Sequence, residues 1–403
     1  MKKILFVINT MGTAGAEKAL LQLLKKTDKT KYEVSLFVLT GQGELISSLP
    51  EGVRLVNKNY DNTPVLSKEG RAHLKKTCIK ALFYRCGFIT KLPYMLRALL
   101  TMISRGRVMP DKLLWRVLSD GAMLPKEEYD LAVAYIEGGS SYYVADHIKA
   151  KKKAAFIHVD YERAGYTRQL DKNCYLAFDR IFTVSDEVKD SFVKAYPEMS
   201  EKTEVFHNIL DADEIKEKAE QGPGFIDGYD GVRILSVGRL TAQKSYETSI
   251  DAMDLLKQNG VRARWYVLGE GDRREALENY INKKGLEDDF ILMGAKDNPY
   301  PYMKQADIYV HCSSFEGKSI AVQEAGILGM PRLLSDCSGN REQVSNGIDG
   351  VLTPLDPKSI YEIIKKLAED EAFRRKLSSA ASEAVLQEDN TERLLSLTGD
   401  TEV

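Results

Sequence analysis

Two acidic side chains eight residues apart, Glu316 and Glu324, form the most informative pair in this 403-residue sequence. Glu316 follows an apolar run that is typical of a strand, and Gly317 lets a ligand approach the backbone closely. Residues 320–328 have a helical pattern, so Glu324 lies inside that helix and free N–H groups at its start face Glu316. Carboxylates accept hydrogen bonds from sugar hydroxyls strongly, so the pair can hold two parts of one ligand. The alternative is that Glu316 caps the helix and Glu324 lies at the surface.

Arg239 and Lys244 form a cationic pair earlier in the chain. They follow Gly238, which comes directly after an apolar run that also predicts a strand. Open α/β sheets bind ligands beyond the carboxyl ends of their strands, and an Arg fork with a Lys point charge suits a diphosphate. The alternative is a pair of solvated surface cations.

Two further candidates lie in the first half of the chain. Gly12 and Gly15 occupy a turn between an apolar run and a helical segment, where small residues let backbone N–H groups approach an anion. Their spacing is not that of the dinucleotide-binding fingerprint, and such glycines are often only structural. His158 ends another apolar run, and taken by itself it is best explained as a hydrogen-bonded histidine at a strand end.

The elements that would position these residues alternate along the whole chain. Short apolar runs predict parallel strands, and the segments between them predict covering helices. Strands are expected at 4–8, 34–39, 53–56, 131–136, 154–158, 180–184, 232–237, 263–268, 290–293, 308–311 and 332–335. Helices are expected at 16–26, 140–149, 185–195, 246–258, 273–284, 301–305, 320–328, 342–346, 359–368 and 371–386.

A stretch rich in glycine and proline at 221–231 divides this alternation into two series. We therefore predict an α/β protein with two Rossmann-like, doubly wound domains. The predicted parts are a first domain at 1–212 with a basic helical insertion at about 64–125, a linker at 213–231, a second domain at 232–380, and a C-terminal helix and tail at 381–403.

The composition excludes several classes of protein. With 43% hydrophobic and 29% charged residues the chain is neither disordered nor a disulfide scaffold, and a net charge of −2 gives no bias toward nucleic acid. Five cysteines without CxxC spacing argue against zinc and favour a reducing compartment. The apolar start of the chain is expected to be a buried strand rather than a signal peptide, and we expect a cytoplasmic protein.

One segment departs from this even charge balance. The segment from Lys68 to Arg116 contains twelve Lys and Arg residues and only two acids, Glu69 and Asp111, which gives it a charge of +10. Aromatic and aliphatic residues are interleaved with the cations, as in amphipathic helices that lie on an anionic membrane surface. A pair of packed helices with a solvated basic face explains the composition equally well.

Taken together, these motifs resemble the retaining group 1 (family 4) glycosyltransferases of bacterial polysaccharide and envelope synthesis. The resemblance covers nearly the whole chain and is strongest over 232–354. It rests above all on Glu316 and Glu324 with seven residues between them. The other matching segments are 12–17, 237–244, 268–271, 298–303, 306–307 and 339–342.

The resemblance implies a GT-B fold, in which two Rossmann-like domains face each other across a cleft. It also implies transfer of a sugar from a nucleoside-diphosphate donor, with UDP favoured over GDP. The transfer would need no metal or cofactor. The acceptor is a glycan or a lipid-linked glycan, and the protein is cytoplasmic with a possible peripheral position on the inner membrane face. The residues implied to act in the reaction are Glu316, His158, Arg239 and Lys244. The residues implied to contact the donor are Gly15, Gly238, Arg239, Lys244, Gly269, Glu316, Gly317, Lys318, Ser319, Ile320, Ala321 and Glu324.

In the roles that the resemblance implies, Glu316 holds the donor sugar and Glu324 binds the nucleotide ribose. Arg239 and Lys244 bind the diphosphate. The sequence departs from the family pattern at Ser245, where a glycine is frequent, and at Lys318 and Ser319, which leaves the donor sugar open. A sugar-binding protein without catalysis and a nucleotide-sugar epimerase are the alternatives on the same scaffold. The sequence 211–213 imitates a metal-binding DxD motif, but we interpret it as the start of a helix.

Overall fold

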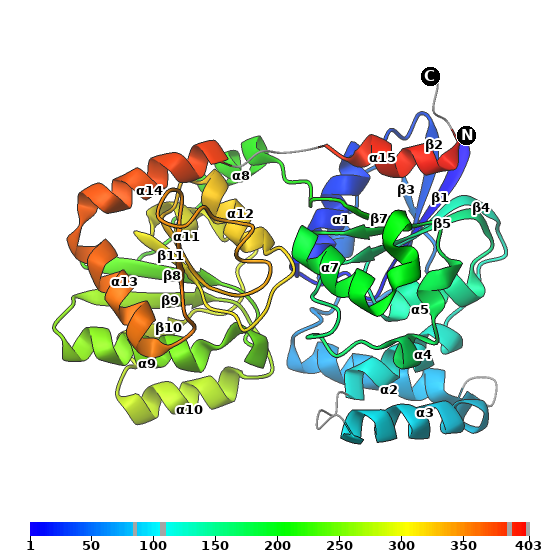
Figure 1. The fold of residues 1–403 in the computed structure, drawn as a ribbon, viewed down its shortest axis with the longest axis horizontal. Helices are drawn as coiled ribbons and strands as arrows, with labels where there is room; N and C mark the ends of the chain where they lie inside the picture. The colour runs from blue at the N-terminus through cyan, green and yellow to red at the C-terminus, as the bar shows by residue number, and fades with distance from the viewer. Residues whose placement is uncertain (84–86, 105–109, 385–388, 400–403) are drawn as a thin grey trace. The chain divides into compact units, whose positions relative to one another are not determined.

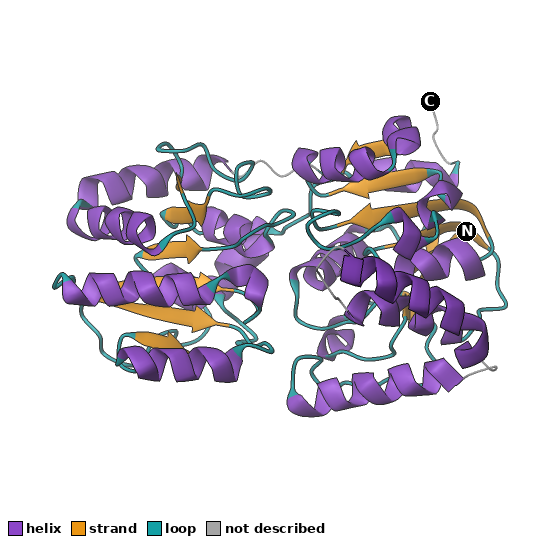
Figure 2. Cartoon of the chain, turned by 60° about the horizontal axis from the view of Figure 1, so that its bottom comes forward, coloured by secondary structure: helices purple, strands orange, loops and turns teal. Residues whose placement is uncertain are grey.

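The computed structural model describes the backbone of residues 1–83, 87–104, 110–384 and 389–399, and the side chains at these positions except 87–92, 95, 101, 104, 110, 111, 383 and 384. The chain forms two compact units, and each has a parallel sheet with helices packed on it (Figures 1 and 2). Unit 1 contains Met1–Ile209 and Glu388–Val403, and unit 2 contains Leu210–Gln387.

Unit 1 is built on a seven-stranded parallel sheet with the order β3-β2-β1-β4-β5-β6-β7. Its strands are β1 (Lys2–Ile8), β2 (Tyr32–Val38), β3 (Val53–Leu55), β4 (Tyr129–Ala134), β5 (Ala150–Ile157), β6 (Arg180–Thr183) and β7 (Thr203–Val205). Its helices are α1 (Gly15–Lys26), α2 (Lys68–Phe83), α3 (Gly87–Ser104), α4 (Pro110–Gly121), α5 (Gly139–His147), α6 (Arg168–Asp171), α7 (Asp186–Ala195) and α15 (Thr391–Leu395).

Unit 2 has a six-stranded parallel sheet with the order β10-β9-β8-β11-β12-β13. Its strands are β8 (Val232–Val237), β9 (Ala263–Leu268), β10 (Phe290–Leu292), β11 (Ile308–His311), β12 (Arg332–Ser335) and β13 (Val351–Thr353). Its helices are α8 (Ala212–Ala219), α9 (Tyr246–Gln258), α10 (Arg274–Lys284), α11 (Tyr300–Gln305), α12 (Ile320–Ile327), α13 (Pro357–Glu369) and α14 (Glu371–Ala384).

Strand periodicity divides the core of unit 2 between the two faces of its sheet. In β9, Trp265 and Val267 enter one hydrophobic cluster, and Tyr266 and Leu268 enter the other. Successive side chains of a strand point to opposite faces, so a strand buried on both faces is apolar throughout. The eleven strands predicted from such apolar runs are confirmed.

Two strands of three residues each, β7 and β13, escaped prediction. The helix predicted at 342–346 is wrong, since these residues form a turn, an irregular stretch and an isolated bridge from Asn346 to Gly350. The buried guanidinium of Arg332 donates to the backbone carbonyls of Gln343 (3.2 Å) and Asp349 (3.1 Å). These hydrogen bonds hold the segment as a loop.

The observed boundary between the units differs from the predicted one. Unit 1 ends at Ile209 rather than 212, and the segment expected to be a linker begins with helix α8 of unit 2. Its N-cap is Asp211, whose carboxylate accepts a hydrogen bond from the Glu214 N–H at 2.9 Å. The sequence 211–213, which imitates a DxD motif, therefore does start a helix.

The end of the chain returns to unit 1. Lys2 Nζ donates to the Thr398 carbonyl at 3.2 Å, Lys26 pairs with Asp389 at 3.1 Å, and Arg393 donates to a carbonyl of β7 at 3.1 Å. The chain therefore passes between the units twice.

Candidate functional site

The candidate site of unit 2 lies where the strand order of its sheet reverses. From β8 the chain proceeds to β9 and β10 on one side, and β11, β12 and β13 lie on the other. Ligands of open α/β sheets bind beyond the carboxyl ends of the strands at this point. Gly238 directly follows β8, and His311 is the last residue of β11. The predicted donor residues of unit 2 are therefore grouped around this switch point.

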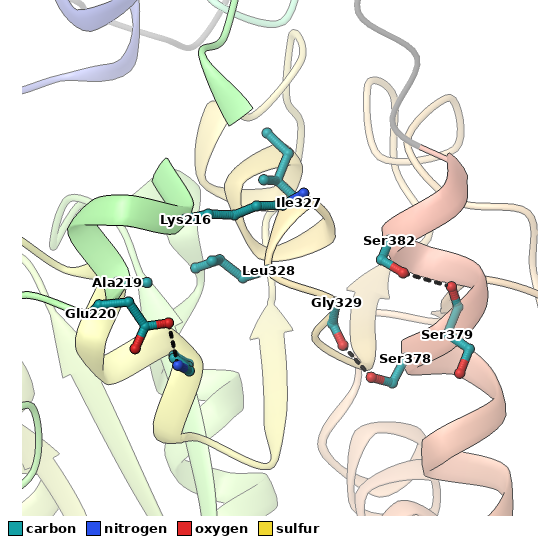
Figure 3. Close-up of a pocket in the computed structure, with 10 residues that line it drawn as sticks. Lys216, Ala219, Glu220, Ile327, Leu328, Gly329, Ser378, Ser379 and Ser382 are labelled. Carbon is teal, nitrogen blue, oxygen red and sulfur yellow. Dashed lines mark hydrogen bonds and ion pairs between the residues drawn. The ribbon is translucent and has the colours of Figure 1, made fainter. Parts of the chain in front are cut away.

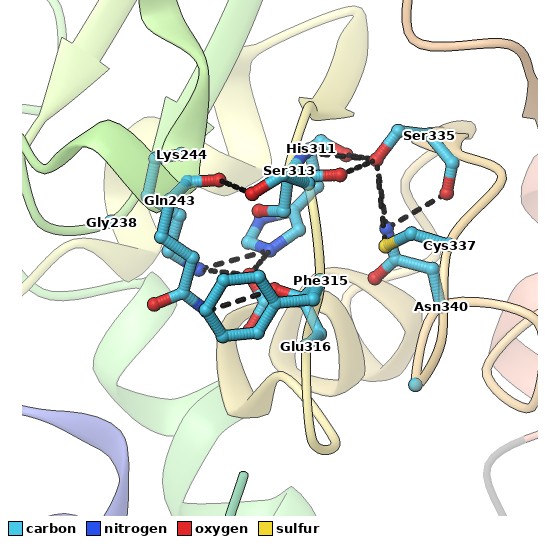
Figure 4. A network of polar contacts seen from close by, with 12 residues as sticks. Gly238, Gln243, Lys244, His311, Ser313, Phe315, Glu316, Ser335, Cys337 and Asn340 are labelled. Atoms are coloured by element: carbon cyan, nitrogen blue, oxygen red, sulfur yellow. Dashed lines mark hydrogen bonds and ion pairs between the residues drawn. The ribbon is translucent and has the colours of Figure 1, made fainter. Parts of the chain in front are cut away.

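Lys244, His311 and Glu316 form a buried polar cluster at the switch point (Figure 4). Lys244 Nζ donates to Glu316 Oε1 at 2.6 Å, and His311 Nε2 lies 3.1 Å from both of these atoms. Their side chains are only 11%, 3% and 9% exposed, respectively. Lys244 is therefore not a solvated surface cation, and Glu316 does not cap α12.

Opposing influences set the charges in this cluster. Burial raises the pKa of Glu316, but the Lys244 ammonium and the hydrogen bond from His311 outweigh burial and hold that pKa well below its ordinary value. Burial and the Lys244 charge both lower the pKa of His311. At neutral pH Glu316 is therefore a carboxylate and His311 a neutral imidazole.

His311 was missed as a site residue in the sequence. The strand prediction placed it correctly at the end of β11, five residues before Glu316. A polar residue at the carboxyl end of a strand beside the switch point is the signal that would have identified it.

The turn that carries Glu316 is fixed from both sides (Figure 4). Gln243 donates to the Phe315 carbonyl at 2.8 Å on one side. On the other side, the Glu316 N–H donates to the Ser338 carbonyl at 3.0 Å, and a Cβ on Gly339 would lie 2.0 Å from the Gly317 carbonyl oxygen. The backbone of the turn is thereby positioned before any ligand binds.

Close backbone packing also explains the glycines beside β8 and β9. A Cβ on Gly269 would lie 1.9 Å from the carbonyl oxygen of Gly238, so a larger residue at 269 would push the two strand ends apart. Ser245, where related sequences often have glycine, has a left-handed backbone with φ of 45°. Non-glycine residues rarely adopt this conformation, which accounts for the frequent glycine there.

Helix α12 begins directly after the turn. Its N-cap is Ser319, so the amides from Gly317 to Ala321 lie at its positive end. Glu324 is 3% exposed and accepts a hydrogen bond from the Tyr300 hydroxyl at 2.7 Å. The alternative that Glu324 is a surface residue is therefore wrong. Tyr300 was not singled out in the sequence, because a tyrosine 24 residues away gives no local signal.

Arg239 differs from the other predicted donor residues. Its side chain is exposed, and it forms no hydrogen bond or ion pair with the part of the chain that the structure describes. Lys318 is half-buried. The structure therefore brings Lys244 and Glu316 together directly and leaves Arg239 at the surface of the same strand end.

The predicted residues of unit 1 lie at the carboxyl ends of its own strands. Gly15 is the first residue of α1, and His158 directly follows β5. The His158 N–H donates to Glu137 Oε2 at 2.9 Å, but its ring atom Nε2 is buried without a partner among the described residues. Burial lowers the pKa of His158 to about 4, so the ring is neutral. It is thus not the fully hydrogen-bonded histidine that the isolated sequence position suggested.

A separate pocket of about 410 Å³ lies between α8, α11, the end of α12 and α14 (Figure 3). Lys216, Leu328 and Ser378 are among its lining residues. It is at the opposite end of α12 from Glu316, and no predicted site residue lines it.

Within residues 1–83, 87–104, 110–384 and 389–399 no three His, Cys, Asp or Glu side chains are grouped as metal ligands. In the same residues no helix is both long enough and apolar enough to cross a bilayer.

Comparison with known sequences finds a family model that matches most of unit 2. Residues 229–384 match the family model of the glycosyl transferases group 1. A Campylobacter jejuni protein named N-acetylgalactosamine-N,N'-diacetylbacillosaminyl-diphospho-undecaprenol 4-alpha-N-acetylgalactosaminyltransferase is 29% identical over 209 residues, which are 51% of this chain and 55% of that protein. The Erwinia amylovora amylovoran biosynthesis glycosyltransferase AmsK is 33% identical over 150 residues, 35% of this chain and 37% of that protein. The chain thus spans about half the length of these relatives or less.

Comparison with solved structures identifies the fold of the whole chain. HepE from Anabaena, solved with UDP and glucose, covers 99% of this chain and 98% of its own with a TM-score of 0.66 and 16% identity. OtsA in its apo form covers 100% of this chain and 99% of its own with a TM-score of 0.68 and 12% identity. At these identities the likeness concerns the fold alone, and it confirms the predicted two-domain GT-B fold.

Proposed function

Residues 229–384 of this chain belong to the group 1 glycosyltransferases, and from that premise we propose that the protein transfers a sugar from a nucleoside-diphosphate donor to a glycan or lipid-linked acceptor. The observation that carries the proposal is the buried cluster of Lys244, His311 and Glu316 at the switch point of unit 2. Buried charges are costly unless they are paired or serve a ligand, and this cluster lies where α/β sheets bind ligands.

The cationic and anionic side chains of the cluster suit the two parts of a sugar diphosphate, its phosphates and its sugar hydroxyls. Lys244 would bind the diphosphate, helped by Arg239 and the amides at the start of α12, and Glu316 would accept hydrogen bonds from the sugar hydroxyls. Without donor, Lys244 and Glu316 neutralise each other. With donor, the phosphate charge would replace Glu316 as the partner of Lys244, and His311 would remain as a partner of Glu316.

The proposed reaction retains the configuration of the sugar. The bond from the anomeric carbon to the diphosphate oxygen breaks through a transition state with oxocarbenium character, and a bond to the acceptor oxygen forms on the same face. The acceptor proton passes to the leaving diphosphate. Lys244, Arg239 and the helix amides stabilise the charge that develops there, so the proposed mechanism needs no divalent metal. In unit 1, Gly15 and His158 are the residues we assign to the donor phosphate and the sugar.

The proposed substrates follow the names of similar proteins. The solved HepE complex contains UDP and glucose, and the C. jejuni relative is named for an undecaprenol-linked acceptor. We therefore propose a UDP-sugar rather than a GDP-sugar as donor, and an acceptor from envelope or exopolysaccharide synthesis.

Slow donor hydrolysis tests the proposed function. Incubated with a panel of UDP- and GDP-sugars, the protein should release UDP from at least one UDP-sugar, because water can replace the acceptor. The rate should be the same with EDTA and with added Mg²⁺, since cationic side chains rather than a metal balance the diphosphate. Release is measured by chromatography of the nucleotide. Dependence on a divalent ion would contradict the mechanism, and release of nucleotide from no sugar would contradict the function.

Glu324 should govern nucleotide affinity. In Glu324→Ala a charge-assisted hydrogen bond to the ribose is lost, which typically costs about 1.5–3 kcal/mol or about 10- to 150-fold in the Kd for UDP. Tyr300→Phe is the matched control, because it removes the hydroxyl that contacts Glu324 and keeps the carboxylate. Its Kd for UDP should stay within about fivefold. Calorimetry measures both, and an unchanged Kd in Glu324→Ala would contradict the assignment.

A further inference from the structure

Helices α2 and α3 of unit 1 expose large apolar side chains. On α3, Leu96, Leu100 and Ile103 are 52%, 65% and 56% exposed, and their spacing puts them on one face of the helix. On α2, Ile79 and Phe83 are 58% and 67% exposed and lie four residues apart. We call these five side chains the apolar face. In the described part of the chain only six other large hydrophobic side chains are exposed, so exposure of this kind is concentrated here.

The inner side of α3 is already occupied by the protein. Ala98 and Met102 pack in a buried cluster with Leu113 of α4 and Leu170 of α6. The Tyr94 hydroxyl donates to the Leu170 carbonyl at 2.9 Å. Figure 1 shows α2 and α3 lying next to each other in the layer of helices around α4. The inner contacts fix the orientation of α3, and Leu96, Leu100 and Ile103 on its other side remain more than half exposed.

The described charged side chains of α2 and α3 are cations with one exception, Glu69. Lys75, Lys76 and Lys80 are exposed on α2, and Arg97 is exposed on α3. Apart from Glu69 neither helix contains an acidic residue. Further cations of this segment, Arg85, Arg105, Arg107 and the side chain of Lys91, lie outside the described residues.

This combination fits a lipid surface better than a protein partner. Protein interfaces are depleted in lysine, whereas interfacial helices that bind anionic membranes combine an exposed apolar stripe with lysine and arginine. Lysine side chains can also lie along an apolar surface and keep their ammonium groups in water.

We propose that the apolar face binds the surface of an anionic bilayer, with the α3 leucines entering the headgroup region and the α2 lysines contacting lipid phosphates. The proposal does not depend on the proposed sugar transfer. If both hold, the enzyme works at the surface that carries a lipid-linked acceptor.

Co-sedimentation with vesicles tests the proposal. The protein should bind vesicles of phosphatidylglycerol and phosphatidylcholine, should not bind phosphatidylcholine alone, and should dissociate as salt is raised. Lys75→Glu/Lys76→Glu should weaken binding about 25-fold or more, because each basic residue near an anionic surface contributes about fivefold. Leu100→Ser/Ile103→Ser should weaken it about tenfold or more by removing apolar insertion.

Matched controls use equally exposed residues elsewhere. Lys358→Glu/Lys376→Glu changes the charge by the same amount on unit 2, and Ile348→Ser removes a 59% exposed apolar side chain there. Both controls should bind vesicles like the unaltered protein, and all variants should keep its far-UV circular dichroism and its rate of UDP release.

Three results would overturn the proposal. The first is equal binding to neutral vesicles, and the second is absence of binding to anionic ones. The third is a dimer of the unaltered protein that Leu100→Ser/Ile103→Ser converts to monomer, which would assign the apolar face to a second copy of the chain. Because none of these readouts is sugar transfer, failure here leaves the proposed function standing.

Discussion

Glu316→Gln should fold normally and lose at least about 100-fold in the rate of sugar transfer. The substitution keeps the shape of the side chain and removes its charge, so sugar hydroxyls lose a charge-assisted acceptor that would strengthen as the donor bond breaks. Lys244 would still have a hydrogen-bond acceptor at 316. Transfer is measured with the donor found in the hydrolysis panel. A rate near that of the unaltered protein would remove Glu316 from the site.

Glu316→Ala should behave differently from Glu316→Gln. The sequence alone predicts that this truncation leaves the fold intact, because a carboxylate in a turn contributes little to a core. The structure corrects that expectation, since the truncation leaves the buried Lys244 ammonium with neither a carboxylate nor any hydrogen-bond acceptor at position 316. Removing one partner of a buried ion pair typically costs about 3–5 kcal/mol. Thermal unfolding should show this loss in Glu316→Ala, and Lys244→Met/Glu316→Gln should recover stability without recovering transfer.

The stability of unit 1 should fall as pH rises, because of Asp171. This carboxyl is fully buried and accepts from the Tyr142 hydroxyl at 2.6 Å and from the Tyr161 hydroxyl. Burial raises its pKa to about 7, although the Tyr142 hydrogen bond and the Arg116 charge oppose the increase. Between pH 4 and pH 7 the folded state therefore keeps a proton that the unfolded state has released, and unfolding becomes easier with rising pH.

Asp171→Asn isolates this effect. Three pH units of difference correspond to about 4 kcal/mol, so the free energy of unfolding of the variant should gain up to that amount relative to the unaltered protein between pH 4 and pH 7. Asp190→Asn, at an exposed position on α7, is the matched control for the loss of one carboxyl. In both variants, hydrogen exchange of the α5 amides measures the free energy of unfolding of unit 1. A constant difference for Asp171→Asn would show that this carboxyl does not titrate in the folded state.

The elements that were predictable from the sequence are the short apolar runs and the helical segments between them. Every predicted strand is present, and α7 begins within one residue of its predicted start, with the Ser185 hydroxyl at the N-cap accepting from the Val188 N–H at 3.3 Å. Local signals fail where tertiary contacts act instead. The loop around 342–346 is held by Arg332, whose effect on a segment more than ten residues away cannot be read from spacing.

The positions of the site residues were predictable where those residues come soon after predicted strands. Glu316, Lys244 and Gly238 lie at the switch point because the strand order brings β8 and β11 together. Their pairing was not predictable, since Lys244 and Glu316 are 72 residues apart and were assigned to different parts of the donor. The contact between His311 Nε2 and both Lys244 Nζ and Glu316 Oε1, 3.1 Å in each case, was likewise not predictable from spacing.

The double passage of the chain between the units has a consequence for dissecting the protein. In genetic terms unit 2 is an insertion near the end of unit 1, because 389–399 packs on unit 1 through Lys2 and Lys26. A deletion that begins near residue 388 would therefore destabilise unit 1, because it uncovers the surface beside β7 where Arg393 is anchored. Unit 2 can be excised as one continuous fragment, whereas unit 1 needs residues 1–209 joined to the final helix through a short artificial bridge.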